Sequence, residues 1–353
     1  MTYLERKIGF CMDSKKKRFL LLFTFVLLQI LIFPILYYFF ITQKQTLVRF
    51  SRSAIENVYV LNMDRSVERR KKYEERLKKT FGNEFLGKSF DEIRFKTTDA
   101  TKDLIIINKT KNEKMTGKQF INKERHFELN NLYHIYDIKD PKFVIKYRPS
   151  IAFPVEKQKW QRASGGTAFI TIGHIGATFS HLRAIKDIAE NGYAMGLILE
   201  DDFEIMKPDS FYDDLDKYLS QTPMNFNILK LDIFSEFGHG RKNRLKIKKR
   251  DLMKSFFKYG SNKYFISNVF KTHMGTAYIV SNEGARQITE FVQNHIFNQT
   301  FVIDDLLYVM LPYKFNFNGI WYAKKPLITQ EDFLNNYNEW KNKTSECEKL
   351  KFH

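Results

Sequence analysis

Three consecutive carboxylates, Glu200-Asp201-Asp202, are the residues of this chain with the clearest capacity for chemistry. They directly follow the apolar run Leu197-Ile198-Leu199, which predicts a buried strand. In open α/β sheets ligands bind beyond the carboxyl ends of strands, so the acids fall where a ligand site is expected. Adjacent like charges are unfavourable unless a positive group lies between them, and a divalent cation with oxygen ligands is the usual partner. The alternative is a solvated acidic turn without a ligand.

Two further pairs of polar residues stand out in apolar surroundings. Asp304 and Asp305 form a second acidic pair, for which the alternative is a helix start that favours acids through the helix dipole. Ser180 and His181 lie in the first turns of a helix predicted from Gly173 to Asn191-Gly192. A hydroxyl and an imidazole at that position either satisfy backbone groups or contact a ligand.

Strands and helices alternate around these residues. We predict strands at 57–62, 196–199, 227–231 and 275–281, and helices at 69–77, 173–190, 211–219 and from 283. Ser66 is predicted to cap the first helix and Gly82 to end it. The alternation predicts an α/β domain with a doubly wound, mainly parallel sheet. Residues 102–162 lack sustained periodicity and are long for a loop, which indicates an insertion that forms a lid or a subdomain.

The N-terminal part of the chain predicts a membrane anchor. Residues 19–41 form an apolar run of 23 residues, long enough to cross a bilayer as a helix. Six basic residues precede the run and three follow it, which places the N-terminus in the cytoplasm. We therefore predict a type II protein whose main domain is lumenal, in the Golgi or the ER. Its parts are a cytoplasmic tail at 1–18, the anchor at 19–41, a stem at 42–55, the domain at 56–330 and a polar tail at 331–353.

The charge of the chain suggests an anionic partner. Lys and Arg number 58 against 40 Asp and Glu, which gives a net charge of +18. Nucleic acid, a membrane surface and a phosphorylated substrate would all suit this charge. The sequence contains no helix-turn-helix, zinc-finger or RNP motif, so we expect no nucleic-acid partner.

Five segments occur in the order and with the residue types of glycosyltransferase family 25, which includes lipooligosaccharide and procollagen hydroxylysine galactosyltransferases. The segments that resemble this family are 61–70 (LNMDRSVERR), 173–181 (GHIGATFSH), 198–203 (ILEDDF), 275–285 (GTAYIVSNEGA) and 303–305 (IDD). The chain departs from the family pattern where Ala177 stands in place of a Cys and where no Pro precedes the acids at 304 and 305. The second departure leaves open which of these two aspartates corresponds to the acidic residue of the family pattern. The long segment at 102–162 leaves the acceptor open.

The resemblance implies a GT-A fold and an inverting transfer of a hexose, galactose or glucose, from a UDP-sugar to a hydroxyl of a glycan or protein acceptor. Glu200 and Asp202 would hold Mn²⁺ or Mg²⁺, which neutralises the departing diphosphate. Asp201 points to the other side of the strand, toward the ribose or a backbone amide. Asp304 or Asp305 would be the catalytic base for the acceptor hydroxyl. The other donor-binding residues that the resemblance implies are Asn62, Asp64, Arg65, Arg69, Gly176, Ser180 and His181.

Two other functions compete with this interpretation. A non-catalytic member of the same fold would act in adhesion or as a binding protein, but such a protein has no need of both acidic pairs. A basic, membrane-tethered protein that binds nucleic acid or anionic lipid would show a steep salt dependence of binding.

Overall fold

The computed structural model describes residues 50–123, 126–149, 172–223, 226–232, 276–298 and 302–311, with shorter pieces at 29, 32, 153–154, 160–161, 167–168, 265–267, 317, 319–323 and 326–330. The predicted anchor at 19–41, apart from residues 29 and 32, lies outside this part of the chain, as does the predicted polar tail at 331–353. Within the described ranges, no helix has the length and apolar character needed to cross a membrane.

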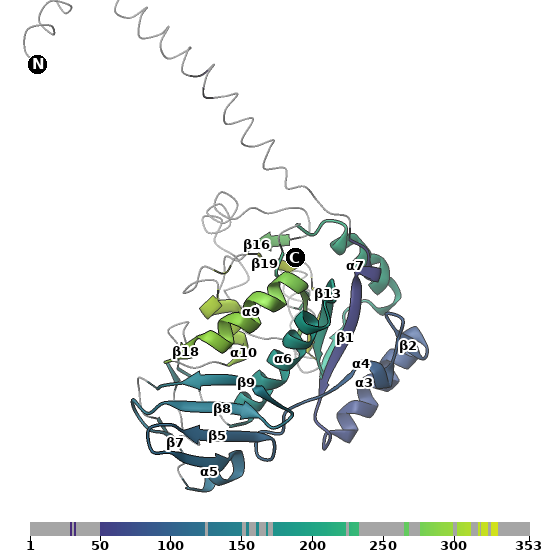
Figure 1. Cartoon of the computed structure of the whole chain (residues 1–353). Coiled ribbons are helices and arrows are strands. Elements are labelled where there is room, and N and C mark those ends of the chain that lie inside the picture. The colour runs from purple at the N-terminus through teal and green to yellow at the C-terminus, as the bar shows by residue number, and fades with distance from the viewer. Residues whose placement is uncertain are drawn as a thin grey trace, which may run out of the picture. The chain divides into compact units, whose positions relative to one another are not determined.

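A seven-stranded mixed sheet forms the centre of the domain (Figure 1). Its strands, in spatial order, are β16 (Phe265–Ser267), β19 (Ile320–Ala323), β15 (Ile228–Lys230), β17 (Ala277–Ser281), β13 (Met195–Glu200), β1 (Ile55–Asn62) and β4 (Arg94–Lys96). Parallel pairing joins β4, β1 and β13, and also β15 and β19. Strand β17 runs antiparallel to both β13 and β15, and β16 runs antiparallel to β19. The predicted sheet is therefore found, with one strand direction predominating, but the two reversed strands make it mixed.

Helices cover both faces of this sheet because neighbouring residues of each strand point to opposite sides. In β13, Leu197 and Leu199 pack with α3 (Val67–Phe81) and α7 (Phe211–Leu219), whereas Ile198 packs with α6 (Ile172–Glu190) and α9 (Asn282–Asn294). Figure 1 shows α3 and α7 on one side of β1 and β13, with α6 and α9 on the other. The sheet thus separates two apolar cores and leaves its strand ends for polar residues.

The segment predicted as an insertion supplies most of a second sheet. Its strand order is β18 (Ile296–Phe297), β9 (Asp140–Tyr147), β8 (Tyr133–Asp137), β5 (Leu104–Asn108) and β6 (Glu113–Thr116), followed in the chain by the short helix α5 (Gly117–Lys123). Ile106, Ile135 and Ile145 are fully buried in the same core as the residues of α6 and α9. This segment is therefore part of the body of the domain and supports α6 from outside the central sheet.

The ends of the helices agree with the sequence except at one cap. Gly82 and Gly192 both have positive φ angles and follow α3 and α6, as predicted. The prediction for Ser66 was wrong, because its side chain makes no capping hydrogen bond. Its φ of −88° and ψ of 51° lie outside the extended region that an N-cap residue usually adopts.

Further small elements are β2 (Glu84–Phe85), β3 (Lys88–Ser89), α4 (Phe90–Ile93), β14 (Phe203–Ile205), β20 (Ile328–Gln330) and α10 (Ile303–Asp305). Helix α10 continues into a π-helix at Leu306–Met310.

Candidate active site

The carboxyl ends of β1, β13 and β15 meet at one edge of the central sheet, and the polar residues gather there. The chain leaves β1 toward β4 on one side, whereas β13 lies on the other side of β1. This change of direction is the topological switch point at which open α/β sheets bind ligands. Leu61 pairs with Glu200 across the two strands, so Asn62 lies beside the start of the acidic segment. The predicted location of the acids at the carboxyl end of a strand is confirmed.

Asp201 is held between two of the predicted donor-binding residues. Its Oδ2 atom accepts a hydrogen bond from Asn62 Nδ2 at 2.8 Å, and its Oδ1 atom lies 3.1 Å from the Arg69 guanidinium. Asn62 is buried, whereas the Arg69 side chain remains 59% exposed. Asp201 thereby fixes the turn after β1 to the end of β13 and keeps an arginine at the open side of the site.

Glu200 is oriented through both of its carboxylate oxygens. His181 Nε2 lies 3.3 Å from Oε1, and Gln330 Nε2 donates to Oε2 at 3.2 Å. Burial raises the pKa of Glu200, but the hydrogen bonds from His181 and Gln330 and the charge of Lys230 outweigh it, so the pKa falls below its usual value. Glu200 is therefore ionised at neutral pH and accepts both hydrogen bonds.

The ionised Glu200 decides the tautomer of His181. A carboxylate can only accept, so Nε2 must carry the proton, and in the neutral imidazole Nδ1 is then an acceptor. The Tyr278 hydroxyl lies 2.7 Å from Nδ1, so it donates to this nitrogen when the imidazole is neutral. Burial raises the pKa of Tyr278 well above its usual value, which keeps this proton on the hydroxyl. His181 is 1% exposed, so the structure places it beneath Glu200 as the group that orients the carboxylate.

Asp202 differs from its two neighbours because none of the described side chains forms a hydrogen bond or an ion pair with its carboxylate. Its Oδ1 atom is buried and makes no hydrogen bond. Burial, together with the charges of Glu200 and Asp201, raises the pKa of Asp202 to about 6, although Arg69 opposes the shift. A cation bound between Glu200 and Asp202 would remove this repulsion, so the two side chains fit the predicted metal.

The number of protein ligands also suits a metal that binds together with a phosphorylated substrate. Over the part of the chain that the structure describes, no three His, Cys, Asp or Glu side chains converge as a closed metal cage. Magnesium-like ions in phosphoryl sites usually take one or two carboxylates and complete their shell with water and substrate phosphates. Glu200 and Asp202 would be those two carboxylates.

The second acidic pair lies at the start of α10 and divides into one buried and one more accessible residue. Asp305 is 4% exposed, and Asp304 is partly exposed. The negative charge of Asp304 raises the pKa of both Asp232 and Tyr278. Asp304 therefore lies on the side of α10 that faces the polar strand ends.

The other predicted donor-binding residues are engaged in contacts within the protein. Asp64 pairs with Arg94 of β4 at 2.6 Å, and Arg65 lies 3.6 Å from Asp99. The Ser180 hydroxyl donates to the Gly176 carbonyl at 2.8 Å and accepts from the Thr98 backbone at 2.9 Å, both in the interior. A Cβ atom on Gly176 would lie 3.0 Å from the Thr98 carbonyl oxygen, so this glycine lets the chain at 98–100 approach α6. These contacts support a packing role for Gly176 and Ser180.

The comparison with known protein families agrees with this geometry. The sequence model of glycosyltransferase family 25, described as an LPS biosynthesis protein family, matches residues 55–307. The chain belongs to glycosyltransferase family 25. A search of curated proteins found no match. The matched range of this family 25 chain contains β1, α6, β13 and both acidic pairs, and it stops before Gln330.

The sequence prediction overlooked four residues that this family 25 site uses. Tyr278 and Gln330 orient His181 and Glu200, and Lys230 and Asp232 form a fully buried ion pair of 2.8 Å at the end of β15. Lys230 and Asp232 could have been found from the sequence. A lysine inside an apolar strand is unusual, and an acid at the carboxyl end of that strand lies where ligand sites are expected, as the acids after β13 do. Gln330 reaches Glu200 because β20 pairs with β14, a segment far away in the sequence, so no local pattern indicates this contact.

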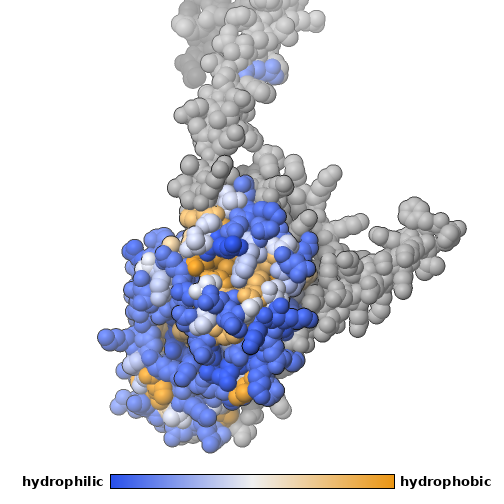
Figure 2. Space-filling view, turned by 90° about the vertical axis from the view of Figure 1, so that its right-hand side faces the viewer, coloured by the Kyte–Doolittle hydropathy of each residue, from blue (hydrophilic) through white to orange (hydrophobic). Residues whose placement is uncertain are grey.

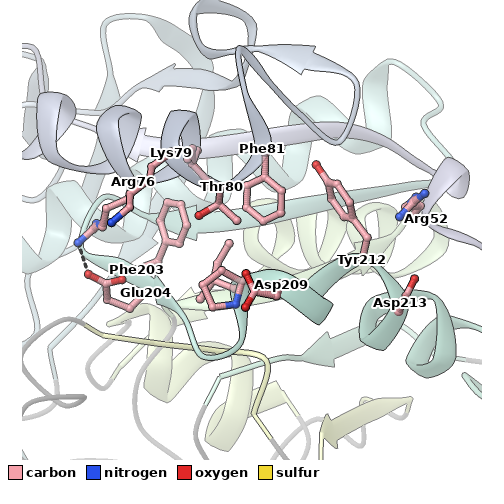
Figure 3. Close-up of a pocket in the computed structure, with 13 residues that line it drawn as sticks. Arg52, Arg76, Lys79, Thr80, Phe81, Phe203, Glu204, Asp209, Tyr212 and Asp213 are labelled. Carbon is pink, nitrogen blue, oxygen red and sulfur yellow. Dashed lines mark hydrogen bonds and ion pairs between the residues drawn. The ribbon is translucent and has the colours of Figure 1, made fainter.

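A cavity of about 800 Å³ lies between α3 and the segment that leads into α7 of this family 25 protein (Figure 3). Figure 2 shows an apolar hollow with a hydrophilic rim on the face that carries these helices. The Arg52 guanidinium lies 4.5 Å from the centre of the Tyr212 ring, and that of Arg76 lies 6.0 Å from the Phe203 ring and pairs with Glu204. Since cations already cover these rings, we assign no sugar-stacking role to the cavity.

Proposed function

We propose that this protein is a metal-dependent, inverting glycosyltransferase that moves a hexose, galactose or glucose, from a UDP-sugar to a hydroxyl of a glycan or protein. The observation that carries the proposal is the uncompensated Asp202 carboxylate beside an ionised Glu200 at the switch point of the sheet. Membership of family 25 supports sugar transfer as the reaction class. The strand order around β1 and β13 supports a GT-A arrangement with the donor nucleotide above these two strands.

Bound Mn²⁺ or Mg²⁺, held by Glu200 and Asp202, would supply Lewis-acid stabilisation of the diphosphate that leaves. Asn62 and Arg69 lock Asp201, so that the two ligand carboxylates keep a fixed direction. His181 and Gln330 bind Glu200 through its two oxygens and limit its rotation. The exposed Arg69 guanidinium adds positive charge where the diphosphate would lie.

We assign the base to Asp304 rather than Asp305. A general base must reach the acceptor hydroxyl and take its proton as the new bond forms. Asp304 is the more accessible of the two and lies close enough to Asp232 and Tyr278 for its charge to raise their pKa values. Asp305, at 4% exposure, is better suited to packing at the start of the helix.

We also propose that the chain is a type II membrane protein whose catalytic domain faces the lumen of the Golgi or the ER. The support is the apolar run at 19–41 and the excess of basic residues before it. A protease-protection assay on membranes that carry the full chain tests this topology. The domain should be protected until detergent is added, and cleavage without detergent would exclude a lumenal domain.

Hydrolysis or transfer by the full chain across a panel of UDP-sugars, with Mn²⁺ and with EDTA, tests the function. We expect turnover of UDP-galactose or UDP-glucose that requires Mn²⁺ and is lost in Asp202→Asn. Turnover that persists in EDTA would exclude metal dependence. Calorimetry with UDP and Mn²⁺ separates the enzyme from a non-catalytic family member, because a silent titration together with absent turnover would favour the binding protein.

A further inference from the structure

Lys230 and Asp232 are the most deeply buried ion pair among the described residues, and both side chains have no exposed surface. They occupy the end of β15, the strand that lies beyond β17 from the acidic segment. Burying two charges requires compensation by close contact and further hydrogen bonds. The contacts of this pair lead to two places, and each of them carries a residue of the proposed active site.

The first set of contacts reaches the backbone of Glu200. Asp232 Oδ2 accepts hydrogen bonds from the Thr276 and Ala277 backbone N–H groups at 3.0 and 3.4 Å. The Thr276 carbonyl in turn accepts from the Glu200 backbone N–H at 2.9 Å. Asp232 thus holds the start of β17, which holds the end of β13 where the acidic segment begins.

The second contact reaches the helix that carries Asp304. The Lys230 ammonium lies 4.3 Å from the centre of the Tyr308 ring. Tyr308 is fully buried and follows Asp304 by one helical turn, within the π-helix that extends α10. A buried cation against an aromatic face is a favourable and directional contact, so Lys230 restrains the position of this helix.

We propose that Lys230 and Asp232 are positioning residues that set the separation between the Glu200 and Asp202 carboxylates and the base Asp304. This inference rests on the proposed function of the same site. Neither side chain reaches substrate, since both are buried. Their effect passes through Thr276 and Tyr308 and, for Lys230, also through its positive charge, which acts on Glu200. A shift of about 1 Å between catalytic groups is enough to lower a rate by roughly a hundredfold. The pair should therefore control the rate of the chemical step more than the binding of the donor.

Lys230→Met, Asp232→Asn and the double variant Lys230→Met/Asp232→Leu test the proposal in the full chain. For each we measure kcat and KM with the UDP-sugar that the wild type turns over, the Kd for UDP with Mn²⁺, and the folded fraction by circular dichroism. We expect kcat per folded molecule to fall at least tenfold, with less than a threefold change in the Kd for UDP. The double variant contains no unpaired buried charge, so it should regain part of the stability, although the Thr276 and Ala277 N–H groups lose their acceptor, and it should keep a low kcat.

Lys186→Met is the matched control. Lys186 pairs with Asp140 at 2.7 Å between α6 and β9, is largely buried, and contacts none of the active-site residues named above. It should lower stability and leave kcat unchanged. A kcat that returns with stability in the double variant, or wild-type kcat in Lys230→Met and Asp232→Asn, would overturn the positioning role. If the wild type turns over no UDP-sugar, the proposed function fails instead.

Discussion

Two strands that run in the same direction on either side of β17, β13 and β15, end in pairs of charged residues with the same spacing but opposite character. Strand β13 ends in Glu200 and Asp202, two like charges that are accessible enough to meet a ligand. Strand β15 ends in Lys230 and is followed by Asp232, two opposite charges that are fully buried. In the first pair, Asp202 has no hydrogen-bond or ion-pair partner among the described side chains, whereas the second pair compensates itself.

This difference shows which strand end receives a ligand and which supports the site. Asp202 retains a buried oxygen without a hydrogen bond, and its pKa is raised to about 6. Asp232 also has a raised pKa, about 7, because it is fully buried, but Lys230 and two backbone N–H groups bind its carboxylate. We call Glu200 and Asp202 the open pair, because it includes a carboxylate without a partner and therefore indicates a ligand. We call Lys230 and Asp232 the closed pair, because a self-compensating buried ion pair indicates a structural role.

The largest effect that tests this contrast is expected at the open pair. Asp202→Asn and Glu200→Gln should each lower kcat/KM by roughly a thousandfold, because loss of a metal ligand removes several kcal/mol of transition-state stabilisation. Folding should not suffer in Asp202→Asn, which removes a repelling charge, whereas Glu200→Gln also loses one of the two hydrogen bonds that the carboxylate accepts. Steady-state kinetics with a UDP-sugar and thermal unfolding measure the two effects. Large unfolding in Asp202→Asn would contradict the assignment of this pair as a ligand site.

The closed pair should respond in the opposite way, with a large loss of stability. Lys230→Met leaves Asp232 buried without its partner, and breaking a buried pair costs about 3 to 5 kcal/mol of unfolding free energy. Urea unfolding of this variant beside Asp202→Asn provides the comparison. A change below about 1 kcal/mol in Lys230→Met would show that the pair is not a structural unit.

The two acids of α10 offer a smaller and finer test. Asp304→Asn should lower kcat by roughly a hundredfold through loss of the base, whereas Asp305→Asn should mainly affect stability because Asp305 is buried. The ratio of kcat values for the two variants, each corrected for folded fraction, decides between them. A larger loss of kcat in Asp305→Asn would reverse our assignment.

Stability should depend on pH through Asp202 by up to about 3 kcal/mol, since one pKa unit corresponds to about 1.4 kcal/mol. The pKa is raised from 3.8 to about 6 in the folded state, so the folded chain binds this proton more tightly than the unfolded chain. The stability of the metal-free protein relative to that of Asp202→Asn should therefore fall as pH rises from about 4 to about 6. Urea unfolding in EDTA measures this difference. A difference that stays constant across that range would show that the pKa of Asp202 is not raised in the folded protein. Added Mn²⁺ should reduce the loss of stability at pH 7.

The smallest effect is expected from the group that orients His181. Tyr278→Phe removes the donor to Nδ1 and frees the imidazole to change tautomer, which should cost about 1 kcal/mol in transition-state stabilisation, or a roughly fivefold loss of kcat. The dependence of kcat on Mn²⁺ concentration should also shift to higher concentration. Unaltered metal dependence would separate His181 from the orientation of Glu200.

The sequence was most informative where periodicity and charge coincide. The strands that end at Asn62 and Glu200 and the helices α6 and α7 were predicted because apolar residues recur at regular spacing and end at glycines or acids. The family resemblance gave expected roles to the two acidic pairs, and the family itself was confirmed over residues 55–307. The predicted metal, donor and acceptor stay predictions.

The missed features depend on pairing between distant segments. The second sheet at 104–147 has alternating buried and exposed residues in short strands, which the many charges of that segment obscured. The antiparallel direction of β17 is set by its pairing with β13 and β15, and no pattern in its own residues indicates it. His181 was predicted as a donor contact from its place in the motif; its ring is buried and stacks on Tyr278, which no pattern in the sequence indicated.

The acidic segment is held by residues near both ends of the described domain, Asn62 from its first strand and Gln330 from its last. During synthesis, Asp201 can meet Asn62 long before Gln330 has left the ribosome. A nascent chain that stops at residue 320 would already contain both acidic pairs but would lack one of the donors that bind Glu200. The order of translation thus makes the orientation of Glu200 one of the last events in assembling the domain.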